Sequence, residues 1–201
     1  MAALGERVGD GVERSDAAAS RETGLAIVAG SLGVMWAEGV VDRVGDLDLD
    51  RFGIVPRHVD GLDGILFSPF LHGGFDHLVG NTVPFALLGG LIALSGAARL
   101  LGVMAIVMVV GGLGTWLVAP ENTVHIGASG LVFGFAAYLV ARGVLSGRLL
   151  ELAVGALVLA VWGVTLLQGL VPEDGISWQG HLFGAVGGVV AARVLAPARR
   201  Q

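Results

Sequence analysis

The sequence contains no cysteine and no lysine, and charged residues of any kind are scarce. The lack of cysteine excludes disulfide bonds and thiol chemistry. Charged residues make up 14% of the 201 residues, whereas a soluble domain averages about 25%. Because hydrophobic residues make up 54%, the composition predicts an integral membrane protein. The net charge of −5 excludes no class of function, since the placement of charges matters more in a membrane protein than their sum.

Glycine is the residue present in excess, at 34 of 201. It has no collagen-like period and is scattered through the apolar runs, which is typical of membrane helices that approach one another closely. The sequence has no nucleotide, metal or flavin motif, so we expect no cofactor, no metal ion and no nucleic acid partner.

Six apolar runs predict an all-α membrane protein, a bundle of six transmembrane helices. Residues 1–23 are polar and lack the apolar core of a secretory signal, so we expect a cytoplasmic N-terminal tail. The first run, Gly24 to Val41, precedes a long connection over residues 42–71, whose apolar residues indicate interfacial placement and short helical pieces. Five further runs complete a membrane domain over 24–196, before a short basic tail at 197–201: 75–95, 100–119, 128–142, 149–169 and 179–196.

Arginine placement orients the six predicted spans. Of the 12 basic residues, all arginine, only three fall in segments on the side opposite the N-terminus, and the two short loops on that side have none. Arginine in short loops marks the cytoplasmic side, so we expect both termini inside the cell, in its inner (plasma) membrane. The three exceptions all lie in the long first connection: Arg43, Arg51 and Arg57.

A serine between glycines opens the short fourth run, in Gly127-Ala128-Ser129-Gly130. From Ser129 to Arg142 is about 20 Å of helix at 1.5 Å per residue. If Arg142 lies at the inner interface of a core about 30 Å thick, Ser129 lies roughly 10 Å below the outer surface. The irregular backbone before it is then tolerated only if it is buried in protein or beside water. We therefore expect Ser129 to face a wet pocket open to the outer side.

The last run brings a histidine to the same depth. His181 precedes Arg193 by about 18 Å of helix. Small-residue stripes on this run and on the fourth would let the two helices approach closely. An imidazole beside a hydroxyl is the pair that nucleophilic catalysis needs, with His181 as general base and Ser129 as nucleophile. The stripes are Gly180, Gly184 and Gly188 in the last run, and Gly130 and Gly134 in the fourth.

A third polar cluster, His72, His77 and Asn81, lies at the start of the second run. His77 and Asn81 are four positions apart and project from one face of a helix. Imidazole and carboxamide N–H groups are the donors that stabilise an oxyanion, so these two residues are candidates for that role. The spacing of the two histidines differs from the His-Glu-x-x-His motif of metalloproteases.

Taken together, these segments resemble the rhomboid family of intramembrane serine proteases. The resemblance rests on three motifs in order and at matching depth, and on six spans with a long first outer connection. It covers about residues 24–196. The motifs are His72-x4-His77-x3-Asn81, Gly127-Ala128-Ser129-Gly130, and Gly180-His181 followed by Gly184.

The resemblance implies a Ser129–His181 dyad without a carboxylate, and an oxyanion site built from His77, Asn81 and backbone N–H groups near Ser129. It also implies that His72 supports the neighbouring loop and second helix. Family members cleave other membrane proteins in or next to transmembrane segments, and the substrate enters laterally from the bilayer beside the fifth span. Apart from membrane lipids, transmembrane substrates are thus the expected partners.

Two features depart from the family pattern. The first connection lacks the Trp-Arg dipeptide of many bacterial members, and Phe133 stands where some members have a tyrosine beneath the catalytic histidine. An aromatic ring can still pack there without the hydroxyl. The remaining histidines, His58 and His125, fall in outer loops, and we expect them to be plain surface residues.

Two other classes of function remain open. A catalytically inactive rhomboid-like protein would bind transmembrane helices as an adaptor or quality-control factor. A small transporter or channel would need a polar path to the inner side, but residues 85–95 and 185–192 are almost wholly apolar. The prediction is a serine endopeptidase that acts within the membrane.

Overall fold

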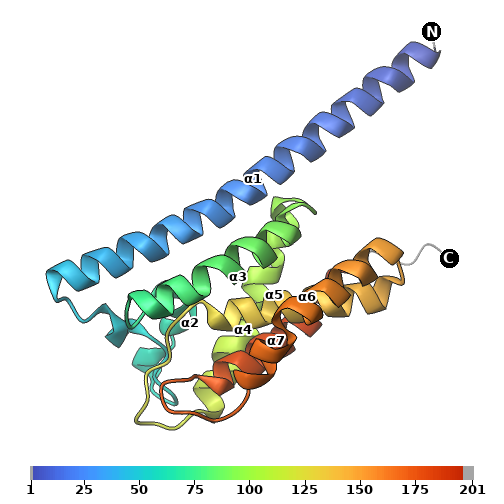
Figure 1. The fold of residues 1–201 in the computed structure, drawn as a ribbon. Helices are drawn as coiled ribbons and strands as arrows, with labels where there is room; N and C mark the ends of the chain where they lie inside the picture. The colour runs from blue at the N-terminus through green and yellow to red at the C-terminus, as the bar shows by residue number, and fades with distance from the viewer. Residues whose placement is uncertain (1, 197–201) are drawn as a thin grey trace.

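The protein is an all-helical membrane protein, and its computed structural model describes residues 2–196 (Figure 1). Within these residues, five helices are long and apolar enough to cross a membrane, and α7 is the shortest of the long helices with 17 residues. The long helices are α1 (Ala2–Gly45), α3 (Phe75–Ala93), α4 (Ala97–Val118), α5 (Ser129–Ser146), α6 (Leu149–Gln168) and α7 (Trp178–Val194).

The later apolar runs coincide with α3 to α7 to within a few residues, but the first helix is longer than predicted. α1 begins at Ala2, whereas the sequence set the first span at Gly24 to Val41. Residues 2–23 contain no proline and include several alanines, glutamates and arginines, which favour helix. The polar segment therefore continues the helix, and Figure 1 shows it extending past the other helices.

The α5–α7 contact is formed by the two predicted glycine stripes. A Cβ atom on Gly184 would overlap the carbonyl oxygen of Gly130, and one on Gly188 would overlap that of Gly134. A Cβ atom on Gly187 would meet the backbone of α4 at 2.9 Å. Membrane helices gain little hydrophobic force from association, so close backbone packing of this kind supplies much of the attraction. It also fixes the register of α5 against α7.

α1 and α6 lie at the edges of the bundle, around the more buried α5. α1 packs beside α3, where Trp36 Nε1 donates to Thr82 Oγ1 over 3.1 Å (Figure 1). α6 packs mainly on α5, and a Cβ atom on Gly155 would lie 3.2 Å from the Cα of Val140. The outward faces of both edge helices carry exposed apolar side chains, which suits contact with lipid.

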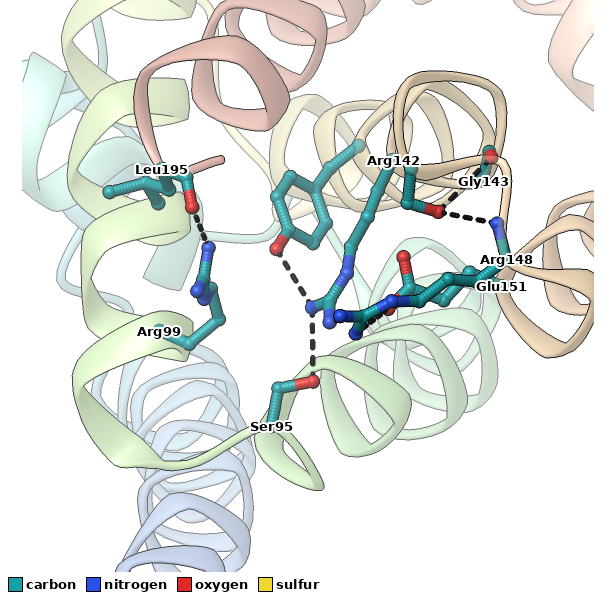
Figure 2. Close-up of polar contacts among 9 residues, drawn as sticks. Ser95, Arg99, Arg142, Gly143, Arg148, Glu151 and Leu195 are labelled. Atoms are coloured by element: carbon teal, nitrogen blue, oxygen red, sulfur yellow. Dashed lines mark hydrogen bonds and ion pairs between the residues drawn. The ribbon is translucent and has the colours of Figure 1, made fainter. Parts of the chain in front are cut away.

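At the end of α5 farthest from Ser129, a polar cluster joins the adjacent ends of five helices, α3 to α7 (Figure 2). The guanidinium of Arg142 donates to Ser95 Oγ over 3.0 Å and to Tyr138 OH over 3.2 Å. It also pairs with Glu151 at the start of α6 over 2.9 Å, and Arg99 of α4 donates to the Leu195 carbonyl that follows α7. Hydrogen bonds from a charged guanidinium are stronger than those between neutral groups, so the cluster holds the helices together at this end.

The long connection between α1 and α3 contains short helices, as predicted. Its centre is attached to the end of α4: Arg57 donates to the carbonyls of Leu117 and Ala119 over 3.1 and 2.8 Å and pairs with Glu121 at 2.9 Å. These carbonyls are left unpaired by the helix itself. The short helices are η1 (Leu49–Phe52), η2 (Val59–Gly61), α2 (Gly64–Phe67) and η3 (Ser68–Phe70).

Candidate active site

Ser129 and His181 face each other across the α5–α7 contact. Ser129 is the first residue of α5, and His181 lies in the first turn of α7. The Oγ of Ser129 is 2.9 Å from Nε2 of His181, which is hydrogen-bond distance for a nucleophile and its base. His181 is 8% exposed, so its imidazole is largely shielded from competing solvent.

The other nitrogen of His181 determines which way this hydrogen bond runs. Nδ1 lies 2.7 Å from the carbonyl oxygen of Gly169, at the C-terminus of α6. A carbonyl only accepts, so Nδ1 must carry the proton of the neutral imidazole. Nε2 is then an acceptor, and the hydroxyl of Ser129 donates a hydrogen bond to it. This is the tautomer that a general base requires.

Phe133 packs against His181. Its ring stacks on the imidazole with centroids 4.1 Å apart and planes 4° from parallel. Phe133 is one turn along α5 from Ser129, so the same helix carries Ser129 and the ring that stacks on His181. The stacking supports the role expected for an aromatic ring at this position, and the supporting role of Phe133 stays a prediction.

The loop before Ser129 is held from the first connection. Gly127 has φ +108°, which disfavours any residue with a side chain, and its N–H donates to the Ser68 carbonyl over 2.8 Å. The N–H of Ala128 points to Nε2 of His72 over 3.4 Å, while Nδ1 of His72 donates to the Phe70 carbonyl over 3.2 Å. The role expected for His72 in supporting this region stays a prediction, and these contacts support it.

His72 is suited to that arrangement only as a neutral imidazole. Burial, reinforced by the charge of nearby His77, lowers the pKa of His72 to about 4, although the hydrogen bond to the Phe70 carbonyl acts in the opposite direction. Both of its nitrogens therefore keep the donor and acceptor roles described above at neutral pH.

His77 and Asn81 lie beside the dyad without bonding to it. The imidazole of His77 is exposed and lies against Gly127, where a Cβ atom would be 2.6 Å from its Nε2. Asn81 is buried, and one N–H of its carboxamide donates to the carbonyl of His77 over 3.0 Å. Their predicted role in binding an oxyanion is untested by this geometry.

A cavity of about 1200 Å³ opens beside Ser129 and His181. Its lining comes from α3, α5 and α6, from the start of α7, and from the loops before α5 and α7. Among the described residues, no group of three or more His, Asp or Glu side chains is placed to hold a metal ion. The residues from α3 are Asp76, His77, Gly80, Asn81 and Pro84, and those from α6 are Trp162, Thr165, Leu166 and Gln168.

His125 was expected at the surface, and this prediction is wrong. The side chain is 8% exposed, and burial lowers the pKa of its imidazole. Nδ1 lies 2.6 Å from Oγ of Ser177, and Nε2 lies 2.8 Å from Oγ1 of Thr123. The sequence signal that could have found Ser177 is its place before an apolar helix, where serine is a preferred N-cap.

The amino-acid sequence is similar to one protein family and to several individual bacterial proteins. A family model described as Rhomboid domain matches residues 61–198, more than half of the chain. The uncharacterised protein Rv1337 of Mycobacterium tuberculosis is 43% identical over 171 residues, which cover 81% of this chain and 71% of that protein. The uncharacterised protein ML1171 of Mycobacterium leprae is 40% identical over 179 residues, covering 85% and 70%. A Bacillus subtilis protein named "Putative rhomboid protease YdcA" is 30% identical over 125 residues, covering 61% and 62%.

The tautomer of His181 is directly testable by 15N NMR of the histidine side chains. In the neutral protein we expect Nδ1 protonated and Nε2 unprotonated, with the signal assigned by its loss in His181→Asn. Gly169→Ala should perturb the Nδ1 signal, because the new Cβ would lie 3.0 Å from Nδ1 and 2.6 Å from the Phe133 ring. Gly163→Ala on the same helix meets no atom within 4 Å and should leave it unchanged. A proton on Nε2 would contradict the assignment.

Proposed function

This chain belongs to the rhomboid family, and we propose that it is an intramembrane serine endopeptidase that cleaves membrane proteins in or next to their transmembrane segments. The observation that carries the proposal is the 2.9 Å contact between Ser129 Oγ and His181 Nε2. The Gly169 carbonyl on the far nitrogen supports the general-base tautomer. A non-catalytic helix-binding role would need neither of these contacts.

In the proposed reaction, Ser129 Oγ attacks the carbonyl carbon of the scissile peptide bond, and His181 Nε2 takes the hydroxyl proton. The imidazolium that forms donates its Nδ1 proton to the Gly169 carbonyl, at the C-terminal end of α6 where a positive charge is favoured. Nε2 then returns the proton to the leaving amine. Water, activated by the same imidazole, hydrolyses the acyl-enzyme and regenerates Ser129.

Several hydrogen-bond donors near Ser129 are available to the oxyanion of the proposed tetrahedral intermediate. α5 begins at Ser129, so the N–H groups of its first turn lack partners within the helix. Asn81 uses one carboxamide N–H on the His77 carbonyl, which leaves a second for substrate. The exposed imidazole of His77 lines the same cavity. We assign transition-state stabilisation to these groups, where one donor is worth about 100-fold or more in rate.

The substrate is proposed to enter between α3 and α6, which both line the large cavity. α6 packs mainly on α5 and presents an apolar face to lipid. It is therefore the helix beside the dyad that the fewest packing contacts hold in place. A transmembrane helix hides its carbonyls in hydrogen bonds, and the segment that is cut must therefore unwind. The cavity beside Ser129 has room for an extended segment and for the hydrolytic water.

For the membrane topology we propose six spans with both termini in the cytoplasm of the cell and the dyad opening to the outer side. The short α7 then makes the sixth crossing. Arginine placement supports this orientation, because the Arg142 cluster lies about 20 Å from Ser129 along α5. The proposed membrane is the plasma membrane.

Cleavage of a single-span model substrate in proteoliposomes tests the activity. With small residues at the outer end of its span, we expect cleavage by wild type and none by Ser129→Ala or His181→Ala. His77→Ala and Asn81→Ala should lower kcat about 100-fold each. His58→Leu, a substitution of an exposed histidine in the first connection, serves as the control and should cleave normally. Retained cleavage by purified, folded Ser129→Ala would overturn the assignment.

The absence of cysteine from the sequence makes the topology simple to measure. Asp174→Cys, in the loop before α7, should react with a membrane-impermeant maleimide in intact cells. Leu149→Cys, exposed at the start of α6, should react only after permeabilisation. The opposite pattern, or labelling of both sites in intact cells, would refute the proposed orientation.

A further inference from the structure

A second serine–histidine pair lies beside the dyad, with the two residue types exchanged. His125 Nδ1 is 2.6 Å from Ser177 Oγ, and both residues precede the dyad members by four positions. Each pair is separated by 52 residues in the chain. Two side-chain hydrogen bonds therefore join the same two segments, one in the dyad and one, four residues earlier in each segment, in this pair.

The hydrogen bonds around His125 form a continuous series, in which each group donates to the next, from the Gly180 N–H to the Pro120 carbonyl. The N–H of Gly180 donates to Ser177 Oγ over 3.3 Å, and the Ser177 hydroxyl can donate onward to Nδ1 of His125. With its proton on Nε2, His125 donates to Thr123 Oγ1 over 2.8 Å, and Thr123 donates to the Pro120 carbonyl over 2.5 Å. A neutral imidazole satisfies each of these groups, as buried polar atoms require.

Backbone hydrogen bonds hold both His125 and Ser177 in place close to the dyad. The backbone of His125 pairs with Ile54 in both directions, at 2.9 and 3.0 Å, so its Cα is held by the first connection. On the other side, Ser177 is the N-cap of α7, and its carbonyl accepts the N–H of His181 over 3.0 Å. A displacement of Ser177 would therefore be passed directly to the residue that carries the base.

We propose that His125 is a positioning residue that, through Ser177, sets the distance between Ser129 and His181. The inference rests on the proposed protease function. On one side of the dyad, the Gly130–Gly184 contact fixes the spacing of α5 and α7. On the other side, where α5 has not yet begun, the His125–Ser177 bond joins the loop to α7. Ser129 and His181 therefore lie between two contacts that join the same segments, the Gly130–Gly184 packing and the His125–Ser177 hydrogen bond.

This arrangement matters because nucleophilic attack is sensitive to small displacements. A shift of about 1 Å in a reacting group can cost about 100-fold in rate. The loop from Ala119 to Ala128 carries the backbone that precedes Ser129 and contains no helix. Its rigidity comes from side-chain and backbone bonds, of which the His125–Ser177 bond is one that reaches α7.

The same pair is poorly arranged to act as a second nucleophile and base. Nε2 of His125 is directed to Thr123, and the oxygen of Ser177 already accepts the Gly180 N–H. In a positioning role, the Gly180 bond caps α7 and the Thr123 bond fixes the orientation of the His125 imidazole. The positioning role therefore explains the geometry more completely than a second catalytic centre does.

A double-mutant cycle tests the coupling through inactivation by a fluorophosphonate. The saturation of the labelling rate gives kinact and KI separately for wild type, His125→Leu, Ser177→Ala and the double variant. We expect His125→Leu to lower kinact about 10-fold or more with KI unchanged, and the double variant to be no slower than the slower single variant. Multiplicative losses in the double variant, or an unchanged kinact in His125→Leu, would overturn the proposal.

Conservative variants separate positioning from simple loss of folding. His125→Asn keeps an acceptor near the place of Nδ1 and should retain most of kinact, whereas His125→Gln places its amide near Nε2 and should not. Thermal unfolding and gel filtration check that each variant is folded, and His58→Leu is the matched control. Equal kinact for the Asn and Gln variants would contradict the assigned bond.

Failure of this inference can be told apart from failure of the protease assignment. If folded wild type is not labelled at Ser129, the proposed function fails and the positioning role falls with it. If wild type is labelled normally and His125→Leu reacts equally fast, only the positioning role is refuted. Labelling of Ser177 in Ser129→Ala would also refute it, because it would show that the second pair is itself reactive.

Discussion

The contact on which the site depends is the meeting of two glycine-lined helix faces. Because Gly184 and Gly188 have no Cβ, the carbonyls of Gly130 and Gly134 lie against the backbone of α7. Their approach fixes both the distance and the register of α5 and α7. The first turns of the two helices, and with them Ser129 and His181, then lie side by side. A methyl group on this interface would separate the helices and so the hydroxyl from the imidazole.

The electrostatics of the pair follow from backbone groups and not from a third side chain. In a triad, a carboxylate orients the histidine; here the Gly169 carbonyl occupies that place, 2.7 Å from Nδ1. The end of α6 thus helps to form both the cavity wall and the hydrogen bond that sets the tautomer. Since the Gly169 carbonyl at the end of α6 binds His181, the proposed entry of substrate beside α6 would also disturb the hydrogen bond to the proposed base.

Side chains with a periodic or motif-like pattern could be predicted from the sequence. The helix positions, the glycine stripes and the pairing of Ser129 with His181 at one depth follow from spacing. The length of α1 was missed because a polar segment can continue a helix once an apolar part has nucleated it. The Gly169 carbonyl has no sequence signal, since every residue has one. His125 was misjudged because a loop position does not reveal that Ser177 and Thr123 satisfy its imidazole.

The most direct test of the account is the identity of the residue that a fluorophosphonate modifies in the purified protein, read by mass spectrometry. A serine becomes reactive only when a base removes its proton, so the adduct reports the dyad without any knowledge of the substrate. The account predicts one adduct on Ser129 in wild type and none in folded His181→Ala. An unmodified wild type, or a Ser129 that reacts equally fast without His181, would contradict it.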